Sequence, residues 1–139
     1  MITCKEFITE KEIEELLNSS NNSLKTFRYF NTRSTSIVNT HKYNVMCYYN
    51  SYPVSYGHLD LDKNFKLWLG IFVSDDYQGM GFGKETIKIL LNKFNIFSDK
   101  TLYLSVDENN LKARFLYEKF GFVMFDAKDN TVYYILNKE

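Results

Sequence analysis

Apolar side chains repeat with helical spacing in two segments of the second half of the chain. Within residues 84–95 they recur three and four positions apart, as on one face of a helix: Ile87, Leu90, Leu91 and Phe94. Residues 111–120 show the same spacing, and Gly121 stands where a helix commonly ends with a positive φ. The pattern predicts two amphipathic helices, each packing one face against another layer.

Shorter segments rich in β-branched and aromatic residues predict strands: residues 2–7, 43–49, 54–60, 65–73, 101–106, 122–126 and 132–136. Thr9 and Glu12 form the capping box of a further helix, and residues 50–53 read as the four-residue loop of a hairpin. Residues 24–36 are compatible with a short helix or an irregular arm. We expect an α/β (α+β) fold in a single domain over residues 1–139, with a mixed, mostly antiparallel sheet of about seven strands and three to four helices packed on both faces.

Charge and cysteine content exclude several classes of protein. The 139 residues include 17 Lys and Arg against 17 Asp and Glu, so the basic surface of a nucleic-acid-binding protein is not expected. No apolar run approaches the about 18 residues of a membrane span, which favours a cytoplasmic protein with no membrane partner. Cys4 and Cys47 form no CxxC pair, so we expect two reduced, buried thiols. Together with His41 and His58 they lack the ligand spacing of a metal site, and no metal is expected.

A glycine-rich segment lies between a predicted strand and a predicted helix: Gln78, Gly79, Met80, Gly81, Phe82, Gly83 and Lys84. Glycines let backbone N–H groups approach an anion closely, and the N-terminus of the next helix adds partial positive charge. A Walker A loop would need glycine at residue 78 and Ser or Thr at residue 85, where Gln78 and Glu85 stand. A dinucleotide fingerprint would need glycine in place of Lys84. The segment instead has the form Gln-x-x-Gly-x-Gly.

A second motif has the form N-x-x-A-x-x-L-Y-E-K-x-G-F and consists of Asn110, Ala113, Leu116, Tyr117, Glu118, Lys119, Gly121 and Phe122. Together with the glycine-rich loop, this motif resembles the GNAT superfamily of acetyl-CoA-dependent N-acetyltransferases. Both motifs occur in the family's order, on the elements expected to carry them. The resemblance is close over residues 68–122 and elsewhere extends to the order of the elements.

The resemblance implies a cofactor site for acetyl-CoA. The backbone of the strand at Ile71, Phe72 and Val73 would pair with the pantetheine arm, as an added strand pairs with a sheet edge. The loop would hold the pyrophosphate through Gln78, Gly79, Met80, Gly81, Phe82, Gly83 and Lys84. Asn110 would contact the cofactor from the other side, and Tyr117 would lie near its sulfur.

Tyr117 is the expected general acid. A phenol with a pKa of about 10 can protonate a departing thiolate whose conjugate acid has a pKa of about 8.5. The alternative is that Tyr117 simply belongs to the apolar face of its helix. The developing oxyanion would be met by a backbone N–H of residues 71–73.

The general base departs from the family pattern. Many relatives have Glu at positions that correspond here to Leu67 and Ser105, neither of which can take a proton from an ammonium group. Ser105 could orient a water instead. His58 and Asp60 are the direct candidates, since they share one face of a strand beside the Trp68 strand, and Asp60 could alternatively hold the ammonium group as a counter-ion. The remaining candidates, His41 and Glu108, rank lower.

Aromatic residues recur in the half of the chain without family motifs and in the last hairpin: Phe27, Tyr29, Phe30, Tyr48, Tyr49, Tyr52, Tyr56, Tyr133 and Tyr134. Alternation puts about half of them in the core, and the others could line a cleft for a ring-shaped substrate. Arg28 and Arg33 could bind a phosphate or carboxylate, or simply be surface charges. We expect a small-molecule amine as substrate, with an amino sugar as the favoured form.

Two other functions remain open. The chain could acetylate protein N-termini or lysines, or it could be an inactive acyl-CoA-binding module, as the missing carboxylates at Leu67 and Ser105 would permit. The edge of the last hairpin could pair with a second copy, so both a monomer and a homodimer are compatible with the sequence.

Overall fold

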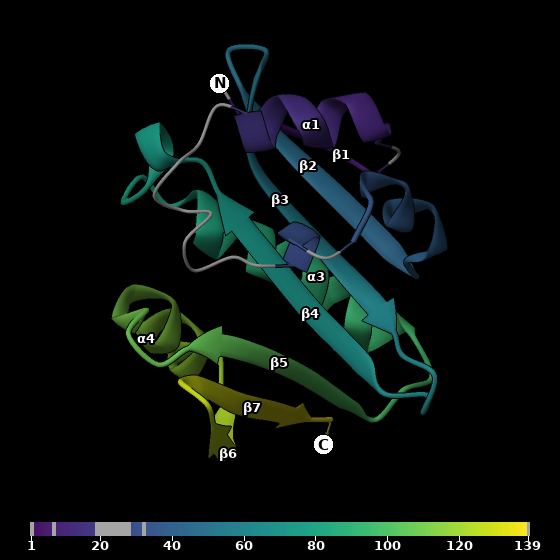
Figure 1. The fold of residues 1–139 in the computed structure, drawn as a ribbon, viewed down its shortest axis with the longest axis vertical. Helices are drawn as coiled ribbons and strands as arrows, with labels where there is room; N and C mark the ends of the chain where they lie inside the picture. Colours follow the sequence, from purple (N-terminus) through teal and green to yellow (C-terminus); the bar gives the residue numbers. More distant parts are fainter. Residues whose placement is uncertain (1, 7, 19–28, 32, 139) are drawn as a thin grey trace.

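Seven strands form one sheet in the computed structural model, which describes residues 2–6, 8–18, 29–31 and 33–138 (Figure 1). The strands are β1 (Ile2–Lys5), β2 (Tyr43–Tyr49), β3 (Tyr52–Leu61), β4 (Leu67–Val73), β5 (Thr101–Asp107), β6 (Val123–Lys128) and β7 (Thr131–Asn137). Their order is β1-β2-β3-β4-β5-β7-β6, and β4 and β5 are parallel while the other neighbouring pairs are antiparallel. The expected mixed, mostly antiparallel sheet is confirmed.

Helices cover both faces of the sheet, as predicted. They are α1 (Glu10–Asn18), α3 (Phe82–Ile96), α4 (Leu111–Lys119) and the short 3-10 helices η1 (Tyr29–Asn31), η2 (Thr35–Thr40) and η3 (Asp75–Tyr77). One core lies between the sheet and α3 and α4, and includes Ile87, Leu90 and Tyr117. A second core lies on the opposite face, where Ile13 and Leu16 of α1 pack against the sheet (Figure 1).

The local signals at the helix ends act as the sequence indicates. The backbone N–H of Glu12 donates to Oγ1 of Thr9 at 3.2 Å, and the N–H of Thr9 donates to the Glu12 carboxylate at 3.0 Å, so the capping box is formed. Gly121 follows α4 with φ 96°. The first hairpin differs from the prediction. Asn50 and Ser51 both have positive φ and make a two-residue turn, so β3 already begins at Tyr52.

Strands β4 and β5 separate along their length. Their parallel pairing joins Leu67 to Leu102 and Trp68 to Tyr103, at the start of both strands. Beyond this point β4 continues to Val73 beside β3, whereas β5 continues beside β7 (Figure 1). The divergence leaves backbone groups in the second half of β4 that β5 does not cover.

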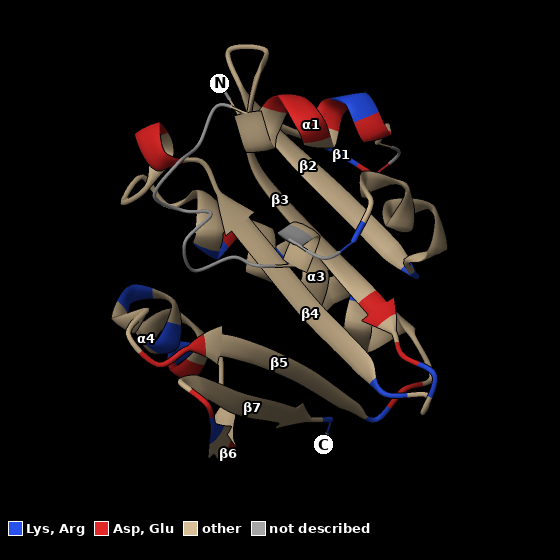
Figure 2. Cartoon of the chain, viewed as in Figure 1, with Lys and Arg blue, Asp and Glu red and all other residues tan. Residues whose placement is uncertain are grey.

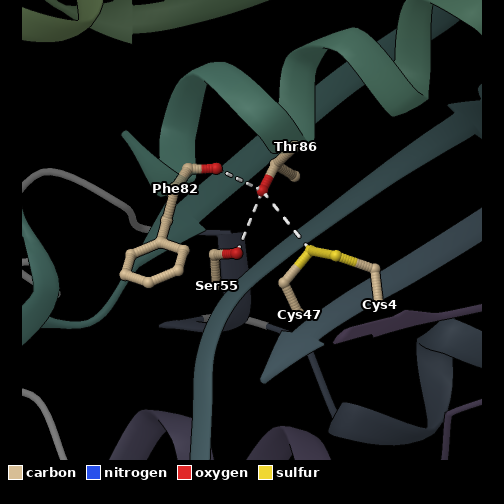
Figure 3. The surroundings of a disulfide bond; sticks show 5 residues. All are labelled: Cys4, Cys47, Ser55, Phe82 and Thr86. Carbon is tan, nitrogen blue, oxygen red and sulfur yellow. Dashed lines mark hydrogen bonds between the residues drawn. A yellow bond between two sulfur atoms is a disulfide. The ribbon is translucent and has the colours of Figure 1, made fainter. Parts of the chain in front are cut away.

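The two cysteines are bonded to each other, which corrects the expectation of free thiols. Cys4 of β1 and Cys47 of β2 are direct cross-strand partners, with 4.0 Å between their Cα atoms, and they form a disulfide (Figure 3). Beneath it, Sγ of Cys47 lies 4.0 Å from the hydroxyl of Thr86 in α3, which is itself 2.9 Å from that of Ser55. A pairing between residues this far apart in sequence follows from the register of the sheet, which spacing alone does not reveal.

Within the described residues, no helix has both the length and the apolar character needed to cross a membrane. The same part of the chain contains no group of three or more His, Cys, Asp or Glu arranged to hold a metal ion.

Candidate active site

A cleft of about 400 Å³ opens where β4 and β5 diverge, between the glycine-rich loop and α4. Its walls contain nearly all of the residues that the resemblance assigns to the cofactor: Ile71, Phe72, Val73, Gln78, Gly79, Gly81, Phe82, Gly83, Lys84, Asn110 and Tyr117. Met80 is the exception. This residue is 55% exposed and does not line the cleft.

The loop between β4 and α3 has the geometry of an anion site. Gly79 and Gly81 have φ of 79° and 88°, in the left-handed region that glycine adopts without strain. Gly81 is also the N-cap of α3, so the first N–H groups of a 15-residue helix begin at the cleft. The side chain of Gln78 donates to the carbonyl of Val73 at 3.3 Å and ties the loop to the end of β4. These features fit the pyrophosphate of an acyl-CoA.

Helix α4 forms the opposite wall of the cleft. Asn110 is its N-cap, and Oδ1 of Asn110 accepts from the N–H of Ala113 at 3.3 Å, a structural role that adds to its place in the cleft. Lys112 and Lys119 also line the cleft, opposite Lys84 of α3. Figure 2 shows Lys and Arg in blue on α4. From the sequence alone, Lys119 stands out only as part of the second motif, and Lys112 is not singled out. Their spacing of seven residues on one helix is the signal that could have identified them.

Tyr117 belongs to both the cleft and the core. Its side chain is buried in the wall of the cleft, and its ring packs edge-on against Phe122 at 5.9 Å between ring centroids. Burial raises the pKa of Tyr117, so the phenol keeps its proton at neutral pH. The two alternatives from the sequence, acid and core residue, are therefore not exclusive.

The two positions at which the resemblance would place a Glu differ from each other in this structure. Leu67 is buried in the core beneath α3. Ser105 is exposed and lines the cleft. Only the second of these positions could bring a polar group to the reacting atoms.

His58 and Asp60 share one face of β3, as expected, and pair with Gly70 and Trp68 of β4. This face points away from α3, since Gly57 on the other face lies against Thr86 and Leu90. His58 is 2% exposed, and its imidazole lies directly against Gly70, which lines the cleft. Burial lowers the pKa of His58 well below its ordinary value, and the charges of His41 and Arg33 lower it further, so the ring is neutral. Asp60 is more accessible, with a side chain that is 25% exposed.

His41 was ranked below His58 from the sequence, but the structure brings the two together. Their rings lie 4.3 Å apart between centroids. Nε2 of His41 is 2.5 Å from the Tyr29 hydroxyl, which donates to Asp60 at 3.0 Å. Tyr56 contacts both histidines. The sequence pattern alone assigns neither Tyr29 nor Tyr56 a polar role.

Most of the other aromatic residues have structural roles. Tyr134 is fully buried, as Tyr56 is, and Tyr49 packs against Tyr77 and Phe82 near the loop. The Tyr48 hydroxyl donates to Glu12 of α1. Tyr133 instead packs with Trp68, on the side of the sheet that carries Asp60.

Of the two arginines that could bind a phosphate or carboxylate, the structure describes Arg33. Arg33 is exposed, and its guanidinium lies 4.2 Å from the centroid of the Tyr29 ring, beside the His41 cluster. Phe27 and Arg28 lie outside the described residues.

Known proteins share this architecture. The sequence model of the Acetyltransferase (GNAT) family matches residues 10–122. The crystal structure of ribosomal-protein-S18-alanine N-acetyltransferase from Escherichia coli superposes with a TM-score of 0.76 at 18% identity, covering 99% of this chain and 94% of that one. A putative acetyltransferase from Salmonella typhimurium, solved with acetyl-CoA, gives a TM-score of 0.78 at 15% identity over 99% and 94% of the two chains. These structures support the fold.

Curated relatives match a shorter part of the sequence. Spermine/spermidine N(1)-acetyltransferase of Bacillus subtilis is 41% identical over 63 residues, which cover 44% of this chain and 41% of that enzyme. The [ribosomal protein bS18]-alanine N-acetyltransferase of Haemophilus influenzae is 44% identical over 60 residues, covering 43% of this chain and 40% of that enzyme. The chain thus matches less than half the length of either relative. Because the family model matches most of the chain, this protein belongs to the Acetyltransferase (GNAT) family.

Proposed function

We propose that this protein is an N-acetyltransferase that moves an acetyl group from acetyl-CoA to a primary amine of a small molecule. The observation that carries the proposal is the position of Tyr117, a protonated phenol in the wall of the cleft that the glycine-rich loop closes. A site that merely stored acyl-CoA would not need an acid there.

Acetyl-CoA supplies an activated thioester, and the chain has to provide a neutral amine, a donor for the oxyanion and a proton for the departing thiolate. In the proposed direct transfer, Tyr117 gives its hydroxyl proton to the thiolate. A backbone N–H in the second half of β4 stabilises the oxyanion, since β5 does not pair with this part of the strand. His58 takes the proton from the amine, and Asp60 attracts the ammonium form to the same side of the sheet.

The acceptor is the open part of the proposal. The aromatic side chains Trp68, Tyr103 and Tyr133 lie together on the side of the sheet that carries Asp60. They would suit an amino sugar, as expected from the sequence, or the alkyl chain of a polyamine such as those that the Bacillus subtilis relative acetylates. Protein N-termini are the second candidate, because two similar proteins are ribosomal-protein-alanine N-acetyltransferases. The cytoplasmic location and the choice between monomer and homodimer remain parts of this proposal.

The deciding experiment is thiol release from acetyl-CoA in the presence of amino sugars, polyamines, amino acids and N-terminal peptides. Turnover with one small-molecule class and none with peptides would support the proposal. Turnover with peptides alone would favour the second candidate. Binding of acetyl-CoA by calorimetry without turnover on any amine would favour the inactive acyl-CoA-binding module instead.

A further inference from the structure

We propose that the acceptor is a linear diamine or polyamine, and that Asp60 and the indole of Trp68 bind the ammonium group that does not react. The proposal rests on the proposed acetyltransferase activity and narrows its acceptor to one chemical class. It gives Trp68 a role in specificity and sets the spacing between the two amino groups.

Four aromatic side chains form a strip on the sheet beside the cleft: Trp68, Tyr103, Tyr133 and Phe125. Trp68 and Tyr103 are direct partners across β4 and β5, and their rings lie 5.4 Å apart between centroids. Tyr133 packs against Trp68, and Phe125 packs against both tyrosines. Gly70, which follows Trp68 by two residues and shares its face of β4, lines the cleft. An acceptor that extends out of the cleft on this face therefore lies over the strip.

Asp60 places a negative charge directly beside this strip. It is the cross-strand partner of Trp68, and its side chain is 25% exposed. Among the described residues, no lysine or arginine forms an ion pair with it. The carboxylate accepts from the Tyr29 hydroxyl at 3.0 Å and lies 3.9 Å from Nε2 of His41. Because burial lowers the pKa of His41, this imidazole is neutral at neutral pH and leaves the charge of the carboxylate uncompensated.

Two cations near the strip are engaged by other groups. The guanidinium of Arg33 donates to the carbonyl of Tyr29 at 2.9 Å and lies 4.2 Å from the centroid of the Tyr29 ring. The ammonium of Lys66 lies 5.2 Å from the centroid of the Tyr103 ring, and the nearby carboxylate of Asp62 offsets its charge. The Lys66 contact also shows that a ring of this strip can hold an ammonium group.

Asp62 fixes the indole of Trp68 as well. Its Oδ2 accepts from Nε1 of Trp68 at 2.9 Å, so the one polar atom of the indole is already bonded. The indole therefore offers its π face to a ligand. A carboxylate beside such a face binds an ammonium group through an ion pair and a cation–π contact.

The reacting amine does not occupy this site. It must be neutral when it attacks the thioester, and the proposed base, His58, lies against Gly70, where a Cβ would be 2.4 Å from Nε2. The charge of Asp60 is therefore left for a second amino group of the same molecule. An amino sugar with a single amino group would leave this charge unpaired, so the charge distribution favours the diamine.

Strand geometry sets the distance between the two amino groups. Gly70 and Trp68 are two residues apart on β4, which corresponds to about 7 Å along the strand. An extended alkyl chain with bonds of about 1.5 Å spans this distance when about four or five methylene groups separate its nitrogens. A shorter diamine reaches only one of the two positions.

The experiment compares α,ω-diaminoalkanes with the n-alkylamines in which a methyl group replaces the second amino group, by thiol release from acetyl-CoA. Both kinds of amine are protonated at neutral pH, since an alkylamine has a pKa of about 10. We expect kcat/KM of the best diamine to exceed that of its matched monoamine about ten-fold or more, with a maximum at about four or five methylene groups. No preference for the diamine, or faster turnover of an amino sugar than of every diamine, would overturn the proposal.

Asp60→Asn should lower the ratio of the two kcat/KM values toward one, because it removes the charge and keeps an oxygen that can accept from Tyr29. Trp68→Leu should lower the ratio in part, and it serves as the second variant should Asp60→Asn fail to fold. The ratio is insensitive to a loss of rate that affects both substrates alike. The matched control is Asp126→Asn, which removes an exposed carboxylate of β6 opposite Tyr133 and should leave the ratio unchanged. An unchanged ratio in Asp60→Asn, or an equally large fall in Asp126→Asn, would overturn the proposal.

A readout without acetyl-CoA separates this proposal from the proposed function. Trp68 is the only tryptophan of the chain, so tryptophan fluorescence reports on this site. The diamine with four methylene groups should change the fluorescence at a half-saturating concentration about ten-fold or more below that of pentylamine, its matched monoamine, and Asp60→Asn should remove this difference. Equal half-saturation by the two amines, or no response to either, would overturn the ammonium site and leave the acetyltransferase assignment intact. Tighter binding of the diamine without turnover of any amine would instead overturn the proposed function, and the acceptor role with it, while the ammonium site would stand.

Discussion

The imidazole of His58 occupies the space that a side chain at residue 70 would need. A Cβ on Gly70 would lie 2.4 Å from Nε2 and 2.6 Å from Cε1 of this ring. The two residues are direct cross-strand partners in β3 and β4. The absence of a side chain at residue 70 therefore lets a buried histidine lie against the strand that forms one wall of the cleft.

Gly70→Ala should destabilise the protein by about 1–3 kcal/mol, the usual cost of overpacking a filled site. The free energy of unfolding can be measured in urea. His58→Ala in the same chain removes the clashing ring, so the double variant should be more stable than the sum of the single effects predicts. Strictly additive effects would show that the two residues do not compete for the same space.

The free energy of unfolding should decrease as the pH falls below about 6.5, the ordinary pKa of histidine. Burial lowers the pKa of His58 and of His41 in the folded protein. Below pH about 6.5 the unfolded chain therefore holds more protons than the folded one, and stability rises with pH, by up to about 1.4 kcal/mol per pH unit for each histidine. This pH dependence can be tested by urea unfolding between about pH 5.5 and 7.5, a range that spans the ordinary pKa of histidine. His58→Gln should reduce the slope, and a wild type with constant stability over this range would contradict the prediction.

Tyr117→Phe should reduce kcat by about 10²–10⁴-fold, the usual contribution of an acid or base, because only the proton donor is lost. The affinity for acetyl-CoA, measured by calorimetry, should change little, since the ring keeps its packing against Phe122. Tyr52→Phe serves as the control. Unchanged turnover in Tyr117→Phe would show that Tyr117 has only a structural role.

Gly81→Glu places a carboxylate in the proposed pyrophosphate site and should weaken acetyl-CoA binding by about ten-fold or more, or about 1.4 kcal/mol. Gly81→Gln controls for size and for the strain of a side chain at φ 88°. Met80→Glu adds the same charge one residue away, on a side chain that points out of the cleft. Met80→Glu should bind acetyl-CoA nearly as the wild type does. If Gly81→Glu binds acetyl-CoA as tightly as Gly81→Gln does, the loop does not hold the pyrophosphate.

The disulfide should account for a measurable part of the stability. A link between residues 43 positions apart restricts the unfolded chain by about 4 kcal/mol in the loop-entropy model. Reductant should therefore lower the urea midpoint of the wild type but not that of Cys4→Ser. Mass spectrometry after alkylation in denaturant provides a direct check, because the oxidised protein should take up no alkyl group until it is reduced. Labelling of both thiols without reductant would show that the pair is not bonded.

The glycine-rich loop and the inner face of α4 could be predicted because they depend on local chemistry. Gly79 and Gly81 supply the positive φ values of the loop, and helical spacing places Tyr117 on the inner face of α4. These features are encoded within a few consecutive residues. Met80 is the one residue from 78 to 84 that does not line the cleft.

The side of the site where we propose that the acceptor amine binds depends on contacts between segments that are distant in the sequence. His41 and His58 come together because β2 pairs with β3 and η2 folds over the same face, and no spacing rule connects the two residues. The same holds for Tyr29 beside Asp60 and for Cys4 beside Cys47. Each of these pairs depends on the register of the sheet or on the docking of an irregular segment. Neither can be predicted from the local sequence pattern.

The sequence by itself therefore determined the order of the elements, the mixed sheet and the glycine-rich loop before α3, since periodicity and glycine chemistry act over short distances. Only the tertiary structure decided that the cysteines bond, that Gly70 makes room for His58, and that two histidines and two tyrosines connect to Asp60. The physical reason is that side chains far apart along the chain become neighbours only after strands have paired, and burial then sets which of their polar atoms meet.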